Sequence, residues 1–316
     1  MDRKNGTVAW YREFLPCEPL RAHVYALFAF GPGPALPAPA RPLLRGTVFH
    51  EPILCAPQFA DGHVSIVFEA GRMFDAAGRW RRDSNALGGT VVGPLRSVGR
   101  TRSVDLAETV GAYFRPGRVL PFFGTAVSAL TDTTVAIDDL WGRDGSHVSR
   151  ELCELDEGAR LDRLESILLA RLRRHGHHRT PALDVPGLAA SILRAQGRIS
   201  VAALAGAAGV SRQHLTREFQ ERIGIGPKLY SRLARFQSVL AYAGSGERLD
   251  WAAVALDMGF ADQSHMIADV RQFSGLTPQA LMRHDWFHPF IERAKRPRDG
   301  RRFSMQTRTN CDITIG

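Results

Sequence analysis

The C-terminal third of this 316-residue chain contains one pattern twice. The first copy reads "GVSRQHLTREFQERIGIGP" (209–227), and the second reads "GFADQSHMIADVRQFSGLTP" (259–278). The copies align at an offset of fifty residues up to the turn glycine and, after one extra residue in the turn, at fifty-one. A turn Gly, a His followed by an apolar residue, and a Gly three residues before a Pro all fall in register. The repeat therefore indicates one structural unit that is built twice.

Each copy has the features of two short helices joined by a tight turn. In the first copy, Ser200 and Ser211 can cap the two helices, because a serine hydroxyl accepts a hydrogen bond from a free N–H of the first turn. Gly209 supplies the tight turn between the helices. Leu215 and Phe219 lie four residues apart and would bury one face of the second helix. This pattern predicts a helix-turn-helix, whose second helix enters the major groove of DNA.

The opposite side of that second helix is a candidate DNA-contacting surface. Spacings of three, four and seven residues place its polar side chains on one stripe, where they offer donors and acceptors to base edges. The candidate residues are Arg212, Gln213, His214, Thr216, Arg217 and Gln220. Other roles stay open: Arg212 can contact a phosphate, His214 can brace the helix, and Arg217 can pair with Glu221.

The segment between the copies, "PKLYSRLARFQSVLAYA" (227–243), predicts a single helix. It begins with Pro, which the first turn of a helix tolerates, and Tyr230, Leu233, Phe236 and Leu240 form a helical stripe. A helix of this size is roughly 25 Å long. It could hold two helix-turn-helix units rigidly, with their recognition helices in successive major grooves ~34 Å apart.

These motifs resemble the DNA-binding domain of AraC/XylS-type transcriptional regulators over residues ~185–285. The most specific match is "GFxDQSHxxxxF…GxTP", present as Gly259-Phe260, Asp262 to His265, and Gly275 to Pro278. The resemblance implies a seven-helix, bipartite DNA-binding domain. It implies that the helix carrying this polar stripe is the first recognition helix. In the second recognition helix the candidate DNA-contacting residues are Gln263, Ser264, His265, Ile267 and Arg271.

The second recognition helix departs from the family pattern in its middle. Ala268 stands where many members have Arg, and Val270 stands where they have Phe. With Ile267 beside them, we expect an apolar exposed middle. Such a helix either touches thymine methyl groups or contributes little direct readout.

Residues 1–142 are predicted to be mostly strand and turn. Partly alternating apolar segments at 63–70 and 104–114 predict strands, and the Pro-rich segment at 31–42 predicts a loop. Four stretches resemble an uncharacterised β-rich domain that commonly precedes this DNA-binding module in bacterial regulators. They are "WYREFLPCEPL" (10–20), "FADGHVSIVFE" (59–69), "VVGPLRS" (91–97) and "AYFRPGRVLPFFGTAVSALTDTTVAIDDLWG" (112–142). The resemblance implies a small β-barrel-like domain that senses an effector or mediates dimerisation.

The predicted organisation is an α+β chain with four parts. Residues 1–142 form the β-rich domain, and 143–185 hold an amphipathic helix and a linker. Residues 186–285 form the all-α bipartite helix-turn-helix domain, and 286–316 form a basic, mobile tail. The leucines of 151–175 recur at helical intervals, so this helix packs either on its own domain or on a second copy of the chain.

Composition and motifs exclude several other classes. The formal charge of +9 is compatible with nucleic-acid binding, but it is weak evidence alone. The four cysteines form no CxxC pair, and His50, Glu51, His63 and Glu69 are too scattered for a metal site. No secretory signal, membrane span, GxSxG elbow, P-loop or HExxH motif is visible. We therefore expect a cytoplasmic protein without catalytic, cofactor or metal sites, and without a membrane partner.

The predicted function is a sequence-specific, DNA-binding transcriptional regulator controlled through its N-terminal domain. Its expected partners are double-stranded DNA, a small-molecule effector of unidentified chemistry, RNA polymerase and a second copy of the chain. Two alternatives stay open. One is an enzyme domain that processes a small molecule and is fused to a regulatory DNA-binding module. The other is an architectural protein that binds DNA without sequence specificity.

Overall fold

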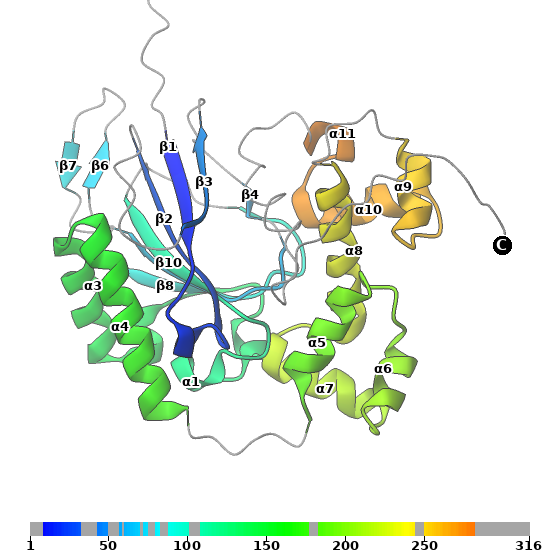
Figure 1. Cartoon of the computed structure of the whole chain (residues 1–316), viewed down its shortest axis with the longest axis horizontal. Helices are drawn as coiled ribbons and strands as arrows, with labels where there is room; N and C mark the ends of the chain where they lie inside the picture. The colour runs from blue at the N-terminus through cyan, green and yellow to red at the C-terminus, as the bar shows by residue number, and fades with distance from the viewer. Residues whose placement is uncertain are drawn as a thin grey trace, which may run out of the picture.

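The computed structural model describes residues 9–32, 43–49, 57–58, 60–69, 72–74, 80–82, 88–100, 108–176, 183–243 and 250–281. These residues form two parts that lie side by side (Figure 1). We call the described residues up to 176 the sheet lobe, and 183–281 the helical lobe. Within the described residues, strands occur only in the sheet lobe, and every regular element of the helical lobe is a helix. The predicted α+β fold class is confirmed.

The sheet lobe is built on a seven-stranded antiparallel sheet with the order β11-β8-β5-β10-β2-β1-β3. These strands are β1 Ala9–Phe14, β2 Val24–Pro32, β3 Leu43–Phe49, β5 Ser65–Glu69, β8 Gly89–Val92, β10 Thr109–Phe114 and β11 Thr134–Ala136. Two small pairs accompany it: β4 Pro57–Gln58 with β9 Gly99–Arg100, and β6 Arg72–Phe74 with β7 Trp80–Arg82. Within the described residues the sheet is open rather than closed, because β3 and β11 are edges that do not pair with each other.

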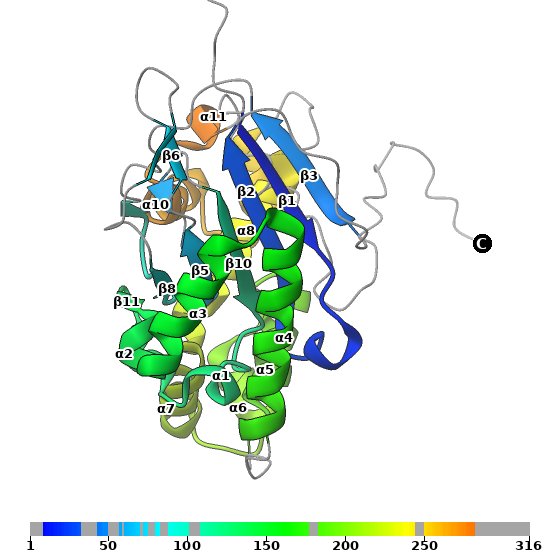
Figure 2. The ribbon, with the colours of Figure 1, turned by 90° about the vertical axis from the view of Figure 1, so that its left-hand side faces the viewer.

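Helices cover one face of the sheet (Figure 2). The longest are α3 Arg143–Glu154 and α4 Glu157–His175, which pack with α1 Leu120–Phe123 and α2 Ile137–Trp141. Short 3-10 turns lie at η1 Glu18–Leu20 and η2 Val127–Leu130. The short helices α1 and α2 were not predicted, since residues 1–142 read as strand and turn.

The predicted amphipathic helix of residues 151–175 is in fact two helices. Asp156 separates them, and its carboxylate accepts a hydrogen bond from the N–H of Ala159, 2.9 Å away, so that it caps the second helix. Leu161, Leu164 and Leu168 are fully buried in the core beneath the sheet. This helix therefore packs on its own lobe, which settles the alternative that the sequence left open.

The helical lobe contains seven helices in its described residues. They are α5 Val185–Arg194, α6 Val201–Ala207, α7 Arg212–Ile223, α8 Pro227–Ala243, α9 Trp251–Asp257, α10 Gln263–Ser274 and α11 Pro278–Leu281. The predicted single helix between the repeats is α8, which is 17 residues long. One hydrophobic core joins all seven helices. Ala60 from the sheet lobe is fully buried in that same core, so the two lobes are packed together.

Several predictions fall outside the described residues. They concern the tail 286–316, most of the Pro-rich segment 31–42, most of the linker, Cys55 and Cys311, and the pair His50 and Glu51. In the described part of the chain, none of the helices combines the length and apolar character that a membrane crossing requires.

Candidate nucleic-acid interface

The first repeat folds as a helix-turn-helix from α6 and α7. Ser200 and Ser211 cap the two helices, accepting from the N–H groups of Ala203 and His214 at 3.0 and 3.1 Å. Gly209 has a φ of 66°, a conformation that a side chain would strain. The N–H of Val210 then donates to the carbonyl of Ala205 at 3.1 Å and closes the turn. The predicted caps and turn are confirmed.

The second repeat reproduces this geometry from different residues. Asp250 and Asp262 take the two capping positions, and Asp262 accepts from the N–H of His265 at 2.7 Å. Gly259 has a φ of 76°, and Phe260 N–H donates to the Ala255 carbonyl at 2.9 Å. The same turn hydrogen bond therefore closes both units. The repeat seen in the sequence is a repeat of structure.

The capping hydrogen bond of α7 leads to a first prediction. A Ser211→Ala variant should lose about 1 kcal/mol of unfolding free energy, because the His214 N–H loses its acceptor at the start of the recognition helix. Ser211→Asn keeps a side-chain acceptor and should remain within about 0.5 kcal/mol of the unchanged chain. Urea unfolding of the full-length variants measures both values. Equal stability of the Ala variant and the unchanged chain would show that this cap contributes nothing.

The predicted DNA-contacting residues lie on α7 and α10, and none of them is buried. The exposed ones are Arg212, Gln213, Arg217, Gln220, Gln263, Ser264, His265 and Arg271. The half-buried ones are His214, Thr216 and Ile267. The other side of each helix faces the core, where Leu215, Phe219, Met266 and Val270 are fully buried. Polar side chains of both recognition helices are thus open to a partner, and the sheet lobe does not cover them.

Side-chain contacts on α7 differ from one sequence expectation. Arg217 donates to Nδ1 of His214 at 2.9 Å, rather than pairing with Glu221. Glu218 forms an ion pair with Arg222 at 3.2 Å.

The middle of α10 is only partly as expected. Ala268 is exposed and Ile267 is half-buried, so an apolar patch does reach the surface. Val270 is fully buried, however, and belongs to the core rather than to the exposed face. This follows from its register, because it occupies the position that Phe219 has in the first repeat.

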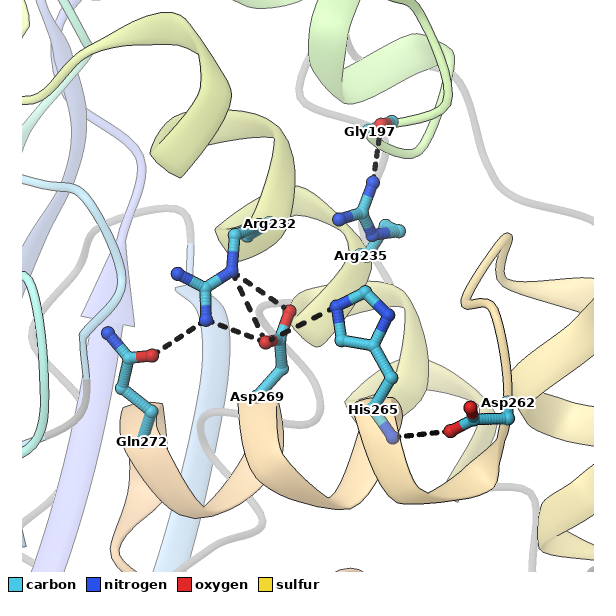
Figure 3. A network of polar contacts seen from close by, with 7 residues as sticks. All are labelled: Gly197, Arg232, Arg235, Asp262, His265, Asp269 and Gln272. Atoms are coloured by element: carbon cyan, nitrogen blue, oxygen red, sulfur yellow. Dashed lines mark hydrogen bonds and ion pairs between the residues drawn. The ribbon is translucent and has the colours of Figure 1, made fainter.

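A polar network attaches α10 to the central helix α8 (Figure 3). Arg232 of α8 donates to Oδ1 of Asp269 at 2.7 Å and to Oε1 of Gln272 at 2.6 Å. Nε2 of His265 lies 3.9 Å from the same carboxylate. The Asp269 side chain is only 1% exposed, whereas that of Arg232 is 27% exposed. The carboxylate is therefore a buried charge, and Arg232 supplies most of its compensation.

A second arginine of α8 reaches the neighbouring elements. Nη1 of Arg235 donates to the carbonyl of Gly197 at 3.1 Å, and its guanidinium lies 5.3 Å from the ring centroid of Phe260. Burial lowers the pKa of Arg235, although the nearby Asp269 carboxylate acts in the opposite direction. Because Gly197 precedes α6 and Phe260 lies in the second turn, this residue connects both helix-turn-helix units to α8.

Arg232, Asp269 and Gln272 were not predicted from the sequence to form a contact. One signal was available, because Asp269 lies beside the apolar positions Met266, Val270 and Phe273 of a helix. A charge on a buried face indicates a partner of opposite sign. The identity of that partner does not follow from spacing, since it lies on another helix.

The described residues contain no cluster of three or more His, Cys, Asp or Glu side chains suited to a metal ion. His63 is buried, with Nδ1 3.3 Å from Asp61, and Glu69 is exposed on another part of the same segment. Three further histidines lie close together in the sequence: His175, the last residue of α4, is exposed, and His177 and His178 lie outside the described residues.

Comparison with protein families gives two matches. Residues 204–284 match the family described as "Helix-turn-helix domain", which covers both repeats. Residues 12–136 match the family described as "Domain of unknown function (DUF6597)", which covers most of the sheet lobe. The comparison with curated proteins found no match.

Among solved structures, the chain is similar to ToxT from Vibrio cholerae. One such structure, a P21 crystal form at 1.65 Å resolution, has 12% sequence identity and a TM-score of 0.39, over 72% of this chain and 92% of that one. Another, wild-type ToxT of strain SCE256 with bound unsaturated fatty acid, has 13% identity and a TM-score of 0.38, over 89% and 97% of the two chains. The family matches and the duplicated unit agree: the chain carries an AraC-type helix-turn-helix domain at its C-terminal end and is a DNA-binding transcription regulator.

Proposed function

We propose that this regulator binds a specific DNA sequence by inserting α7 and α10 into successive major grooves of one duplex. The observation that carries the proposal is the matched pair of recognition helices. Each begins at a capped N-terminus, buries its apolar side in the common core and leaves polar side chains exposed. A chain with one recognition helix would need a second copy of itself to read two grooves, whereas this chain has two recognition helices.

The central helix supports this arrangement. Its 17 residues correspond to about 25 Å of length. It connects the end of the first unit to the start of the second, and Arg232 and Arg235 attach it to the second unit. Successive major grooves on one side of a duplex are ~34 Å apart, a distance compatible with two units at opposite ends of such a helix.

The individual side chains have different proposed roles. Arg212, in the first turn of α7, is proposed to contact a phosphate, which would fix position without reading sequence. Gln213, Arg217 and Gln220 share one stripe and are proposed to meet base edges. On α10, Gln263, Ser264, His265 and Arg271 are the polar candidates. Ile267 would meet a thymine methyl group.

The sheet lobe is proposed to control DNA binding rather than to catalyse a reaction. A small-molecule effector, a second copy of the chain and RNA polymerase are the proposed further partners, and the cytoplasm is the proposed location. The support for control is structural: the sheet lobe packs directly on the helical lobe and contributes Ala60 to its core. A change in the sheet lobe can therefore reach the recognition helices through packed contacts.

The proposal is tested by selecting DNA from a random pool with the full-length protein. We expect enrichment of a site with two half-sites about one helical turn apart. Arg217→Ala should then weaken binding to the selected site by roughly 10- to 100-fold and relax the preference at one base position of one half-site.

Arg222→Ala is the matched control, because it removes the same charge from the same helix. Arg222 is half-buried and paired with Glu218, away from the polar stripe. We expect its base preference to be that of the unchanged protein. If Arg217→Ala left both affinity and base preference unchanged, the assigned face of α7 would be wrong. If no sequence were enriched and binding fell steeply with salt, the chain would be an architectural DNA binder.

A further inference from the structure

The two recognition helices end at equivalent glycines, and both of these lie against the same short segment of the sheet lobe. Gly224 follows α7 with a φ of 87°, and Gly275 follows α10 with a φ of 76°. They occupy matching positions in the two repeats. The segment that meets both is residues 94–98, between β8 and β9, which we call the bridging segment.

At the end of α7 the packing leaves no room for a side chain. A Cβ atom on Gly224 would lie 2.5 Å from Cγ of Pro94 and 2.7 Å from Oγ1 of Thr131. The Thr131 hydroxyl donates to the carbonyl of Gly224 at 2.7 Å. This bond satisfies a carbonyl at the helix terminus, a group that otherwise lacks an intrahelical partner. The sheet lobe thus completes the C-terminal end of the first recognition helix.

At the end of α10 the other end of the bridging segment makes the corresponding contacts. The N–H of Val98 donates to the Gln272 carbonyl at 2.8 Å, and Nε2 of Gln272 donates to the Arg96 carbonyl at 3.1 Å. A Cβ atom on Gly275 would be in ordinary contact with Val98, 3.6 Å away. Gln272 also accepts from Arg232, so the attachment continues into the central helix.

The bridging segment is itself held in place. Asp132 accepts from the backbone N–H of Arg96 at 2.7 Å and also pairs with its side chain. The N–H of Asp132 donates to the Pro94 carbonyl at 3.1 Å. Nearby, the Ala60 N–H donates to the Phe273 carbonyl at 3.1 Å, which adds a second attachment to the end of α10.

The length of the bridging segment limits the separation of the two helix ends. Four residue steps can span at most about 14 Å, because an extended chain covers about 3.3–3.6 Å per residue. The segment contacts both helix ends directly. The ends therefore cannot separate without losing either the packing of Gly224 on Pro94 or the hydrogen bonds between Gln272 and the segment. The central helix α8 connects the two units through the chain, and the bridging segment adds a second connection through noncovalent contacts.

From this arrangement we infer that the bridging segment is a positioning element that fixes the spacing between the two recognition helices, and hence the half-site spacing that the protein accepts. The inference rests on the proposed function, because spacing has meaning only if both helices read DNA. It assigns the sheet lobe a part in recognition itself. An effector or partner that displaces the bridging segment would change the spacing between the helices, without touching either base-reading surface.

The test uses the full-length protein and the site selected by the unchanged chain. Binding is measured to that site and to versions with one or two base pairs inserted or removed between the half-sites. The variant is Thr131→Val with Gln272→Met. It removes one hydrogen bond between the sheet lobe and each helix end, beside the bridging segment at α7 and to that segment at α10, while keeping similar side-chain volumes. Gln279→Met is the control, because it is the same exchange at an exposed residue of α11.

We expect the unchanged chain and the control to lose affinity sharply when the spacing changes. In the double variant, the loss of affinity caused by a changed spacing should be about three- to tenfold smaller. This is within the range typical of coupling between linked sites. We call the loss of affinity on changing the spacing the spacing penalty. The double variant should lower affinity for the original site by a smaller factor than it lowers the spacing penalty. Each single variant, which disturbs the fold less, should show a smaller change in the same direction.

The outcomes separate the inference from the proposed function. If the unchanged chain protects one half-site only, and its binding does not depend on spacing, the proposed two-groove function fails. If the unchanged chain depends on spacing and the variants, with unaltered thermal unfolding, keep the same penalty, the inference is overturned. A reduced penalty in the Gln279→Met control would overturn it as well, because the effect would not depend on the bridging segment.

Discussion

A Phe219→Ala variant is expected to unfold with a free energy about 3–5 kcal/mol below that of the unchanged chain. Phe219 is fully buried on the core side of α7, and its ring packs against that of Tyr230, with 6.2 Å between the ring centroids. Removing the ring leaves a cavity between the recognition helix and the central helix, which close packing cannot easily refill. Urea unfolding, followed by far-UV circular dichroism, measures the loss.

The repeat provides matched controls for this variant. Val270 is also fully buried and has the equivalent position on α10. Val270→Ala removes only two methyl groups, so we expect a smaller loss of roughly 2 kcal/mol. The next residue on α7, Gln220, is exposed, and its replacement by Ala should change stability by less than about 0.5 kcal/mol. Equal losses at Phe219 and Gln220 would contradict the assigned faces of the helix.

An Arg232→Met variant is expected to lose about 3 kcal/mol of unfolding free energy, because it leaves the buried Asp269 carboxylate without its main cation. Breaking a fully buried pair typically costs 3–5 kcal/mol. We expect the lower end, since the Arg232 side chain is 27% exposed and His265 remains 3.9 Å from the carboxylate. The same urea titration measures this loss.

The double variant Arg232→Met with Asp269→Asn separates charge from packing. If the loss comes from an uncompensated buried charge, neutralising that charge should recover at least about 1 kcal/mol of it. If the double variant is as unstable as the single one, the contribution of Arg232 is packing against Phe273, whose ring centroid lies 5.2 Å from its guanidinium. A loss below about 1 kcal/mol in Arg232→Met would show that the pair contributes no more than a surface ion pair.

Both expectations bear on DNA binding, because both concern how a recognition helix is held. The proposed contacts occupy the exposed side of α7 and α10, and Phe219 and Arg232 act from the buried side. A variant that loosens either helix should therefore weaken DNA binding without changing which bases are preferred. Loss of preference at one base position, by contrast, is the expected result only for residues of the polar stripe.

Local rules explain why much of the helical lobe could be predicted from sequence. A serine or aspartate cap, a turn glycine and an apolar residue every third or fourth position depend on neighbours within one helical turn. Ser211, Gly209 and Leu215 accordingly have the structural roles that their spacing predicts. The second copy strengthened the prediction, since two units with the same spacing are hard to obtain by chance. The DNA contacts themselves stay predictions.

The tertiary structure decided what depends on residues far apart in the chain. Arg232 meets Asp269 across 37 positions, Thr131 meets Gly224 across 93, and Gln272 meets Arg96 across 176. No periodicity connects such residues, so neither the partner of the buried Asp269 charge nor the bridging segment could be inferred from spacing. The break at Asp156 and the open sheet were missed for related reasons. A capping carboxylate was hidden within a leucine repeat, and closure of a sheet depends on edge strands that pair over long distances.

The sequence by itself determined that this chain holds two copies of one helix-turn-helix unit joined by a rigid helix, because the determinants of each unit are local. Only the tertiary structure decided how the two units are held relative to each other, because that depends on packing and hydrogen bonds between distant segments. One five-residue segment of the sheet lobe contacts the end of α7 through Pro94 and the end of α10 through Arg96 and Val98, residues that lie far from both helices in the sequence.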